Sequence, residues 1–120
     1  QISEDGELYM RLAQSHINLE NWAAAAEAAR QGIRLGGLKR PDQAQILLGM
    51  SLFNQKRLEQ ARTAFQAASR DERSARAASQ WINYVDSEIK RRDLLTQELP
   101  EMPPRKRDEL LDVIEKQGNQ

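Results

Sequence analysis

A chain of 120 residues is long enough for one domain with a modest core. Its 18 Lys and Arg residues balance 18 Asp and Glu residues, which argues against binding through bulk charge, so no nucleic acid is expected among its partners. The absence of cysteine excludes disulfides and thiolate metal sites, and no apolar run approaches the roughly 20 residues that a membrane-spanning helix requires.

The first two elements predicted in chain order are helices joined by a short turn. Over residues 7–19, apolar residues recur at helical spacing, so that one face carries Leu8, Leu12, Ala13, His16 and Leu19. Asn21 can cap a second helix, whose body is "WAAAAEAARQGIRL". Gly36 and Gly37 are expected to end that helix, because glycine readily adopts the left-handed conformation found after helix ends.

Three more helices are predicted up to residue 92. Pro41 suits the first turn of a helix over residues 41–54, and Asp42 favours the positive end of its dipole. A fourth helix over about 57–70 follows the turn "NQKR", and Asp71 can cap a fifth helix over about 72–92. The fifth helix has one long apolar stripe, formed by Ala77, Ala78, Trp81, Ile82, Val85 and Ile89.

A linker and a tail are predicted after the fifth helix. The stretch "LPEMPP", residues 99–104, holds three prolines and cannot continue a helix, so residues 93–104 are expected to form a linker. Residues 105–120 are predicted to form a tail helix, too short for independent stability, with an apolar set of Leu110, Leu111, Val113 and Ile114. The sequence starts at Gln1 rather than at Met, which leaves room for a signal peptide or domains upstream.

The first two helices recur in the next two after a shift of 36 residues, which pairs Leu12 with Leu48 and Ala13 with Gly49. The same shift pairs Glu20 with Lys56, Trp22 with Leu58, Ala25 with Ala61, Ala29 with Phe65, and Gly32 with Ala68. Two helices joined by a short turn approach closely only where one of them lacks side-chain bulk. We therefore expect Gly49 to make room for a large side chain from its partner helix, in an all-α fold built from repeated helical hairpins.

These residues resemble the tetratricopeptide repeat family, whose repeat has about 34 residues. The second repeat, about residues 42–75, carries the family's large and small residues in order: Leu48-Gly49, Leu52, Leu58, Ala61, Phe65 and Ala68. It departs from the pattern at Gln45 and Arg73. The first repeat, about residues 6–41, has Tyr9, Leu12-Ala13, His16, Trp22 and Ala25 in place, departs at Ala29 and Gly32, and is two residues longer. The resemblance implies a right-handed superhelix of two hairpins within residues 1–92, closed by the helix over 72–92.

A narrower resemblance concerns "GGLKRPDQAQILLGMSLFNQ" and, later in the chain, "QWINYVDSEIKR". These stretches are similar to repeat proteins that accompany TonB–ExbB–ExbD energy-transduction systems of Gram-negative bacteria. This resemblance implies a location in the bacterial periplasm or cell envelope and a place in an envelope transport assembly. The cytoplasm is the alternative location.

No pattern of residues indicates catalysis or the binding of a cofactor or a metal ion. His16, Trp22 and Trp81 fall at helical spacing among apolar residues, where packing is the expected role. Gly36-Gly37 follows a helix rather than a strand and lacks the phosphate-loop pattern. We therefore expect no catalytic residue, no cofactor and no metal site, and we expect that the protein is not an enzyme.

The best candidate site is a groove. In the family that the sequence resembles, the first helices of successive hairpins line a concave surface. The residues placed there are Met10, Gln14, Ile17 and Asn18 on the first helix, Gln43, Ile46, Met50, Phe53 and Asn54 on the third, and Tyr84 on the fifth. Methionine beside an aromatic ring suits a protein or peptide partner with an apolar or helical segment. The alternative is that the fifth helix or the tail folds back over these residues.

Two other functions stay open. Two repeats are fewer than the three or so that solenoids usually need, so the first helix is expected to expose apolar area on its outer side. The chain would then be a structural piece that assembles with itself, and a homodimer through this face or through the tail helix is expected. The second alternative is a regulatory subunit whose basic clusters, at residues 90–92 and 105–107, contact polyanions.

Overall fold

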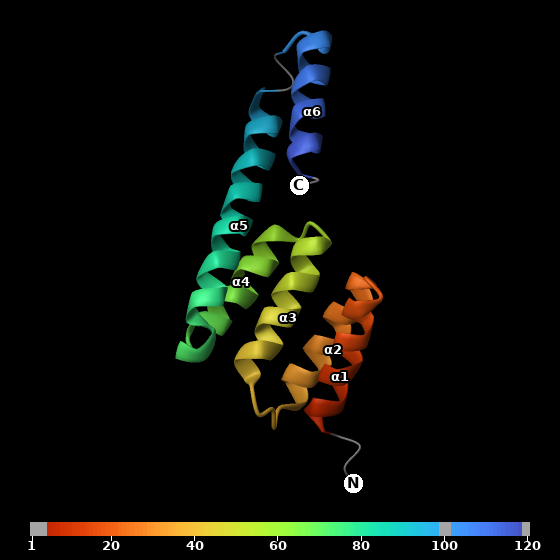
Figure 1. Cartoon of the computed structure of the whole chain (residues 1–120), viewed down its shortest axis with the longest axis vertical. Helices are drawn as coiled ribbons and strands as arrows, with labels where there is room; N and C mark the ends of the chain where they lie inside the picture. Colours follow the sequence, from red (N-terminus) through yellow and green to blue (C-terminus); the bar gives the residue numbers. More distant parts are fainter. Residues whose placement is uncertain (1–4, 99–101, 119–120) are drawn as a thin grey trace. The chain divides into compact units, whose positions relative to one another are not determined.

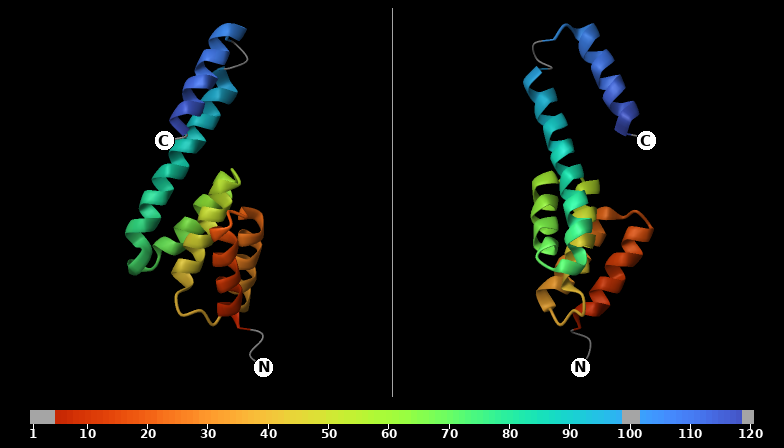
Figure 2. Two further views of the ribbon diagram at one scale, coloured as in Figure 1. Left: turned by 45° about the vertical axis from the view of Figure 1, so that its right-hand side comes forward. Right: turned by 60° about the vertical axis from the view of Figure 1, so that its left-hand side comes forward.

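The computed structural model describes residues 5–98 and 102–118, and these residues form six α-helices and no strand (Figure 1). One hairpin consists of α1 (Gly6–Asn18) and α2 (Trp22–Leu35), and a second consists of α3 (Pro41–Asn54) and α4 (Leu58–Ser69). Next come α5 (Glu72–Glu98) and α6 (Pro104–Gly118). Within each hairpin the helices pack against each other, and α3 also packs against α2 (Figure 2). The prediction of an all-α helical repeat is confirmed.

The contacts divide the chain into two units, residues 1–88 and residues 89–120. We call the first the repeat unit, because it holds both hairpins and the first part of α5. The second, the tail unit, holds the rest of α5 and α6. In the tail unit Leu110 and Ile114 are half-buried, whereas Leu111 and Val113 are exposed. No helix in the described part of the chain is both long and apolar enough to cross a membrane.

Helix α5 is longer than the sequence pattern predicted. It continues to Glu98, so residues 93–98 are helical, and the expectation of a linker over them was wrong. The stretch "DLLTQE" holds no proline or glycine, and most of its residues are good helix formers, so no local signal ends the helix at 92. Of the predicted linker that follows, residues 99–101 lie outside the described residues. Pro104 occupies the first turn of α6, where proline is favoured.

The core of the repeat unit is built mainly from alanine, and at Gly49 the missing side chain leaves space for a large residue of α4. A Cβ atom at Gly49 would lie 2.5 Å from the ring of Phe65 on α4, which is fully buried. The expectation that Gly49 makes room for a large side chain is thus confirmed. In the first hairpin the same pair of positions holds Ala13 and Ala29, which share one buried cluster. The second hairpin therefore fits a large side chain on α4 to the space left on α3, whereas the first hairpin pairs two small residues.

Both hairpins turn in the same way. In the first turn Asn21 N–H donates to the carbonyl of His16 (2.8 Å) and Glu20 N–H to that of Ile17 (2.9 Å). The second repeats this 36 residues later, with bonds from Arg57 to Leu52 and from Lys56 to Phe53. This is the Schellman motif, which places one residue in the left-handed conformation, and those residues are Glu20 (φ 57°) and Lys56 (φ 65°).

The predicted helix ends are mostly confirmed. Gly36 ends α2 with a φ of 76°, Pro41 occupies the first turn of α3, and the Asp71 carboxylate caps α5 by accepting the Arg73 N–H at 2.9 Å. Asn21 stands at the N-cap of α2, but its side chain makes no capping bond there.

Adding a methyl group at Gly49 should destabilise the fold. In an exposed helix Gly→Ala stabilises by about 1 kcal/mol, but here the new Cβ overlaps a buried ring, and overpacking costs about 1–3 kcal/mol. Urea unfolding of Gly49→Ala, Phe65→Leu and the double variant measures this. We expect the double variant to lose less stability than the sum of the two single losses, because the Phe65→Leu substitution removes the ring that the new Cβ atom at position 49 would overlap. Additive losses would show that Gly49 and Phe65 are not coupled.

Glycine at position 56 should suit the second turn better than alanine. A residue with a Cβ pays a steric penalty in the left-handed conformation that exceeds the extra chain entropy which glycine loses on folding. We expect Lys56→Gly to be more stable than Lys56→Ala by about 1 kcal/mol. Thermal unfolding of the two variants side by side measures the difference. Equal stability would contradict the left-handed assignment.

Candidate functional site

The predicted partner-binding residues lie on α1, α3 and α5, within the repeat unit. The 36-residue shift pairs those on α1 with those on α3: Met10 with Ile46, Gln14 with Met50, Ile17 with Phe53, and Asn18 with Asn54. Helix α3 contacts α1 and, through Phe53, also α5. The structure therefore places these residues at equivalent positions on neighbouring helices.

The apolar members of this set are less exposed than the sequence pattern suggested. Ile17, Ile46, Met50 and Phe53 are half-buried. Met10 is half-buried as well and packs against the alanine cluster, with its sulfur close to Gly32 of α2. Met10 and Gln43 line one depression of about 260 Å³ between α1 and α3. Only part of the predicted apolar surface is thus accessible.

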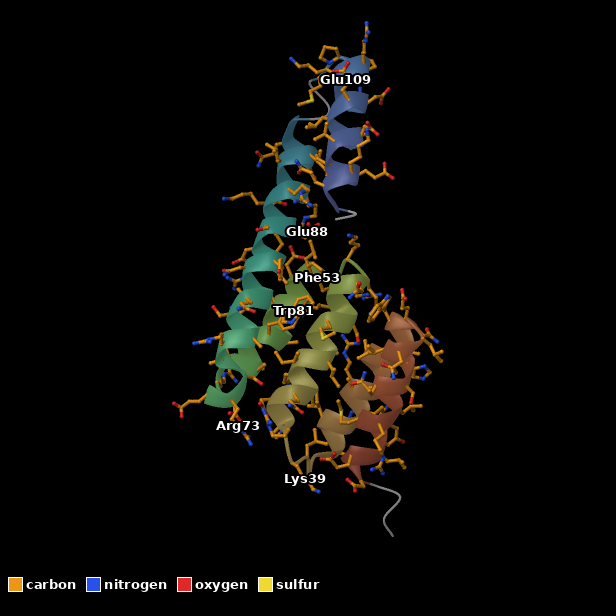
Figure 3. The ribbon with its side chains drawn as sticks, in the orientation of Figure 1. Lys39, Phe53, Arg73, Trp81, Glu88 and Glu109 are labelled. Carbon is orange, nitrogen blue, oxygen red and sulfur yellow. The ribbon has the colours of Figure 1, made fainter. Side chains whose placement is uncertain are left out.

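An aromatic array joins α3, α4 and α5. The indole of Trp81 stacks on the ring of Phe65, with centroids 5.2 Å apart and planes 9° from parallel. Phe53 contacts the same indole edge-on at 5.7 Å (Figure 3). Tyr84 adds a second edge contact at 5.8 Å, and 63% of its surface is exposed. The structure thus brings the predicted residues Phe53 and Tyr84 together through Trp81, and α5 covers part of the α3 face.

The polar members of the set bond mostly to their own helices. Gln14 donates its side-chain amide to Asn18 at 3.0 Å. Asn54 donates to the backbone carbonyl of Met50 at 2.8 Å. Gln43 is exposed. These side chains border the half-buried apolar residues with amide groups and add no charge.

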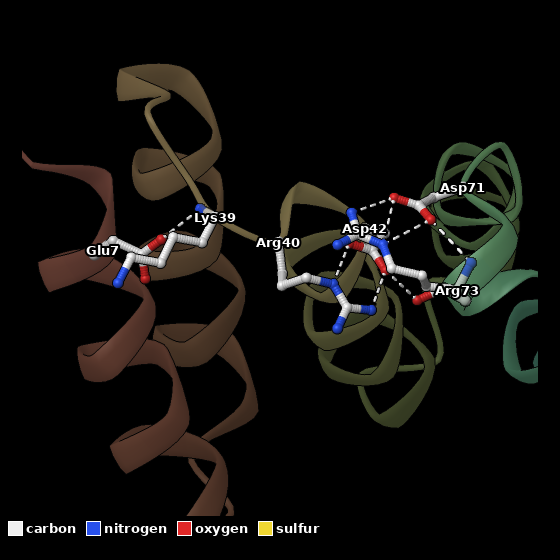
Figure 4. Close-up of polar contacts among 7 residues, drawn as sticks. Glu7, Lys39, Arg40, Asp42, Asp71 and Arg73 are labelled. Atoms are coloured by element: carbon white, nitrogen blue, oxygen red, sulfur yellow. Dashed lines mark hydrogen bonds and ion pairs between the residues drawn. The ribbon is translucent and has the colours of Figure 1, made fainter.

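A buried carboxylate holds the start of α5 against the start of α3. Asp42 is almost fully buried and accepts two bonds from Arg40, at 3.0 Å from Nε and 2.6 Å from Nη2 (Figure 4). The hydroxyl of Ser74 on α5 donates to the same carboxylate at 2.6 Å. Arg73 Nη2 lies 3.7 Å from it and makes a closer ion pair, at 2.7 Å, with Asp71. We call Arg40, Asp42, Asp71, Arg73 and Ser74 the polar latch.

The electrostatics of the polar latch favour charged side chains. Hydrogen bonds from Arg40, opposed by desolvation and helped by the Ser74 hydroxyl, hold the pKa of Asp42 well below its usual range. Bonds from Arg73 likewise lower the pKa of Asp71. Farther along α5, Asp86 pairs with Arg62 of α4 at 2.7 Å, which lowers the pKa of that carboxyl too. These contacts position the first part of α5, and with it Trp81 and Tyr84.

Sequence reasoning missed the polar latch. It assigned Asp42 to the helix dipole and Asp71 to a cap, and both roles are local. Asp42 and Ser74 are 32 residues apart, and Ser74 occupies the first turn of a helix where serine is unremarkable. The one available signal was the paired pattern of an aspartate and an arginine two positions apart, at Arg40-Asp42 and at Asp71-Arg73.

Within residues 5–98 and 102–118, no three His, Cys, Asp or Glu side chains gather to hold a metal ion. His16 is half-buried, and its Nδ1 atom is buried with no hydrogen-bond partner in the described part of the chain.

No model of a protein family matches the chain, and comparisons with curated proteins and with solved structures find no match either. The resemblance to tetratricopeptide repeats therefore stays a prediction from the residues quoted above. The binding role of the groove residues is likewise a prediction.

Replacing Asp42 should weaken the fold in a way that depends on pH. Asp42→Asn leaves Arg40 and the buried Ser74 hydroxyl without a carboxylate to bond to, at a cost of about 1–3 kcal/mol near neutral pH. Because the folded-state pKa is lowered, the carboxylate stabilises the fold above its ordinary pKa, and this contribution is lost as the pH falls below about 4. Urea unfolding should therefore show that the difference in unfolding free energy between wild type and variant becomes smaller below about pH 4.

The matched control is Asp86→Asn, which removes an exposed ion pair and should change stability far less. If the difference in unfolding free energy between wild type and Asp42→Asn stays constant down to about pH 2.5, the ionised Asp42 carboxylate does not stabilise the polar latch.

Proposed function

We propose that the protein is an interaction module that binds an apolar or helical segment of another protein on the face formed by α3 and the first part of α5. The observation that carries the proposal is the aromatic array, in which Tyr84 is 63% exposed yet packed against Trp81. A large exposed ring that is already held in place loses little conformational freedom on binding, which favours its use as an anchor.

The neighbouring surface supports an apolar partner. Ile46, Met50 and Phe53 follow one another along α3 at intervals of four and three residues, so they form one ridge on that helix. A partner helix with apolar residues at the same spacing would complement such a ridge. Methionine in the middle of the ridge adapts to different side chains, which favours a tolerant site.

A phage-displayed library of random peptides, about 15 residues long so that four helical turns are possible, supplies the probe. Selection on the immobilised chain should enrich peptides with apolar residues three or four positions apart. Met50→Ala combined with Phe53→Ala, and separately Tyr84→Ala, should each weaken binding of a selected peptide by about tenfold or more. Isothermal titration measures the affinities, and circular dichroism confirms that the variants stay helical.

Gln66→Ala is the matched control, because Gln66 is exposed on α4, a helix that contributes to the array only through the buried ring of Phe65. Affinity that is insensitive to the groove substitutions, or lost equally in the control, would remove this face from the site.

A further inference from the structure

Helix α1 exposes leucine on the side that α2 does not cover. Leu8 and Leu12 are 49% and 46% exposed. Together with Tyr9, Arg11 and Ser15 they line a shallow depression of about 400 Å³. We call Leu8, Arg11, Leu12 and Ser15 the outer face of α1. It is distinct from the groove residues on the same helix and confirms the expectation that the first helix exposes apolar area.

The equivalent residues of α3 indicate what kind of structure packs on the outer face of α1. A shift of 36 residues carries Leu8, Arg11, Leu12 and Ser15 onto Ala44, Leu47, Leu48 and Ser51 of α3. Three of those four residues lie on the side of α3 that faces the first hairpin. Leu48 packs against the alanine cluster that includes Ala28 and Ala29 of α2, and Ala44 and Leu47 share a depression with Met10 of α1.

Exposure differs sharply between the two copies of this face. Ala44 is 2% exposed and Ser51 is fully buried, whereas their counterparts Leu8 and Ser15 are exposed. The face that is buried on α3 is therefore exposed on α1. The cover at α3 is an alanine-lined helix, which lets the two backbones approach closely.

We propose that the outer face of α1 docks a helical hairpin of the same kind from a partner, whose second helix presents alanines in the manner of Ala28 and Ala29. The interface would continue the packing that already exists between α2 and α3. A second copy of this chain does not offer such a helix. Its α2 is already packed against α3, and its α4 is joined to α5 by the Phe65–Trp81 stack and the Arg62–Asp86 pair.

The test adds one hairpin in register. A tandem protein carries an extra copy of residues 5–40 ahead of residues 5–120, which preserves the 36-residue spacing because Asp5 takes the place of Pro41 after Arg40. Since the chain has no cysteine, Ser15→Cys in the original α1 is a clean reporter. We expect its reaction with a maleimide to be slower by about tenfold or more in the tandem than in the single chain. Gln66→Cys should react equally fast in both.

A second pair of variants separates docking from misfolding. Leu8→Gln with Leu12→Gln in the original α1 should lower the thermal midpoint of the single chain only slightly, since about half of each side chain is already exposed. In the tandem the same pair should restore fast labelling of Ser15→Cys. Equal labelling in the tandem and the single chain, or protection that survives the two glutamines, would overturn the proposal. A labelling rate in the single chain that falls with protein concentration would assign the face to a second copy and overturn it too.

Discussion

The contact between Gly49 and Phe65 is the constraint on which the rest of the repeat unit depends. Without a side chain at Gly49, α3 lies close enough to α4 for the Phe65 ring to occupy the space between them. One face of that ring is then available to Trp81, whose indole lies 9° from parallel with it. Phe53 and Tyr84 take their places around the indole. A missing side chain on one helix thereby determines where an exposed tyrosine stands on another.

Interactions of different kinds hold the first part of α5. At its start the hydroxyl of Ser74 bonds to the buried Asp42, in the middle Trp81 stacks on Phe65, and beyond that Asp86 pairs with Arg62. Burial of the aromatic rings supplies most of the stabilisation, because exposed ion pairs contribute little. A buried carboxylate, by contrast, is tolerated only when its oxygen atoms accept hydrogen bonds. The polar latch therefore determines where α5 lies on α3 more than it contributes to the free energy of unfolding.

Helix α1 carries residues on two different faces. Ile17 occupies the position that matches Phe53 of α3, and Leu8 and Leu12 lie on the outer face. A hairpin docked on the outer face would lengthen the row of first helices, and with it the groove, by one helix. The two proposals are therefore compatible, and a partner that lengthens the array also enlarges the surface available to a peptide.

Local patterns determined much of this protein. Helix spacing, glycine and proline predicted the first four helices within about a residue at each end, and the repeat predicted that Gly49 faces a large side chain. These features depend on neighbours in the chain, where periodicity and steric limits act directly. Only the tertiary structure decided that Asp42 meets Ser74, that Trp81 covers part of the predicted groove, and that Met10 turns towards Gly32. Each of these depends on how one helix lies against another. A one-dimensional pattern marks which face of a helix is apolar, but which side chains meet is set by the packing of whole helices.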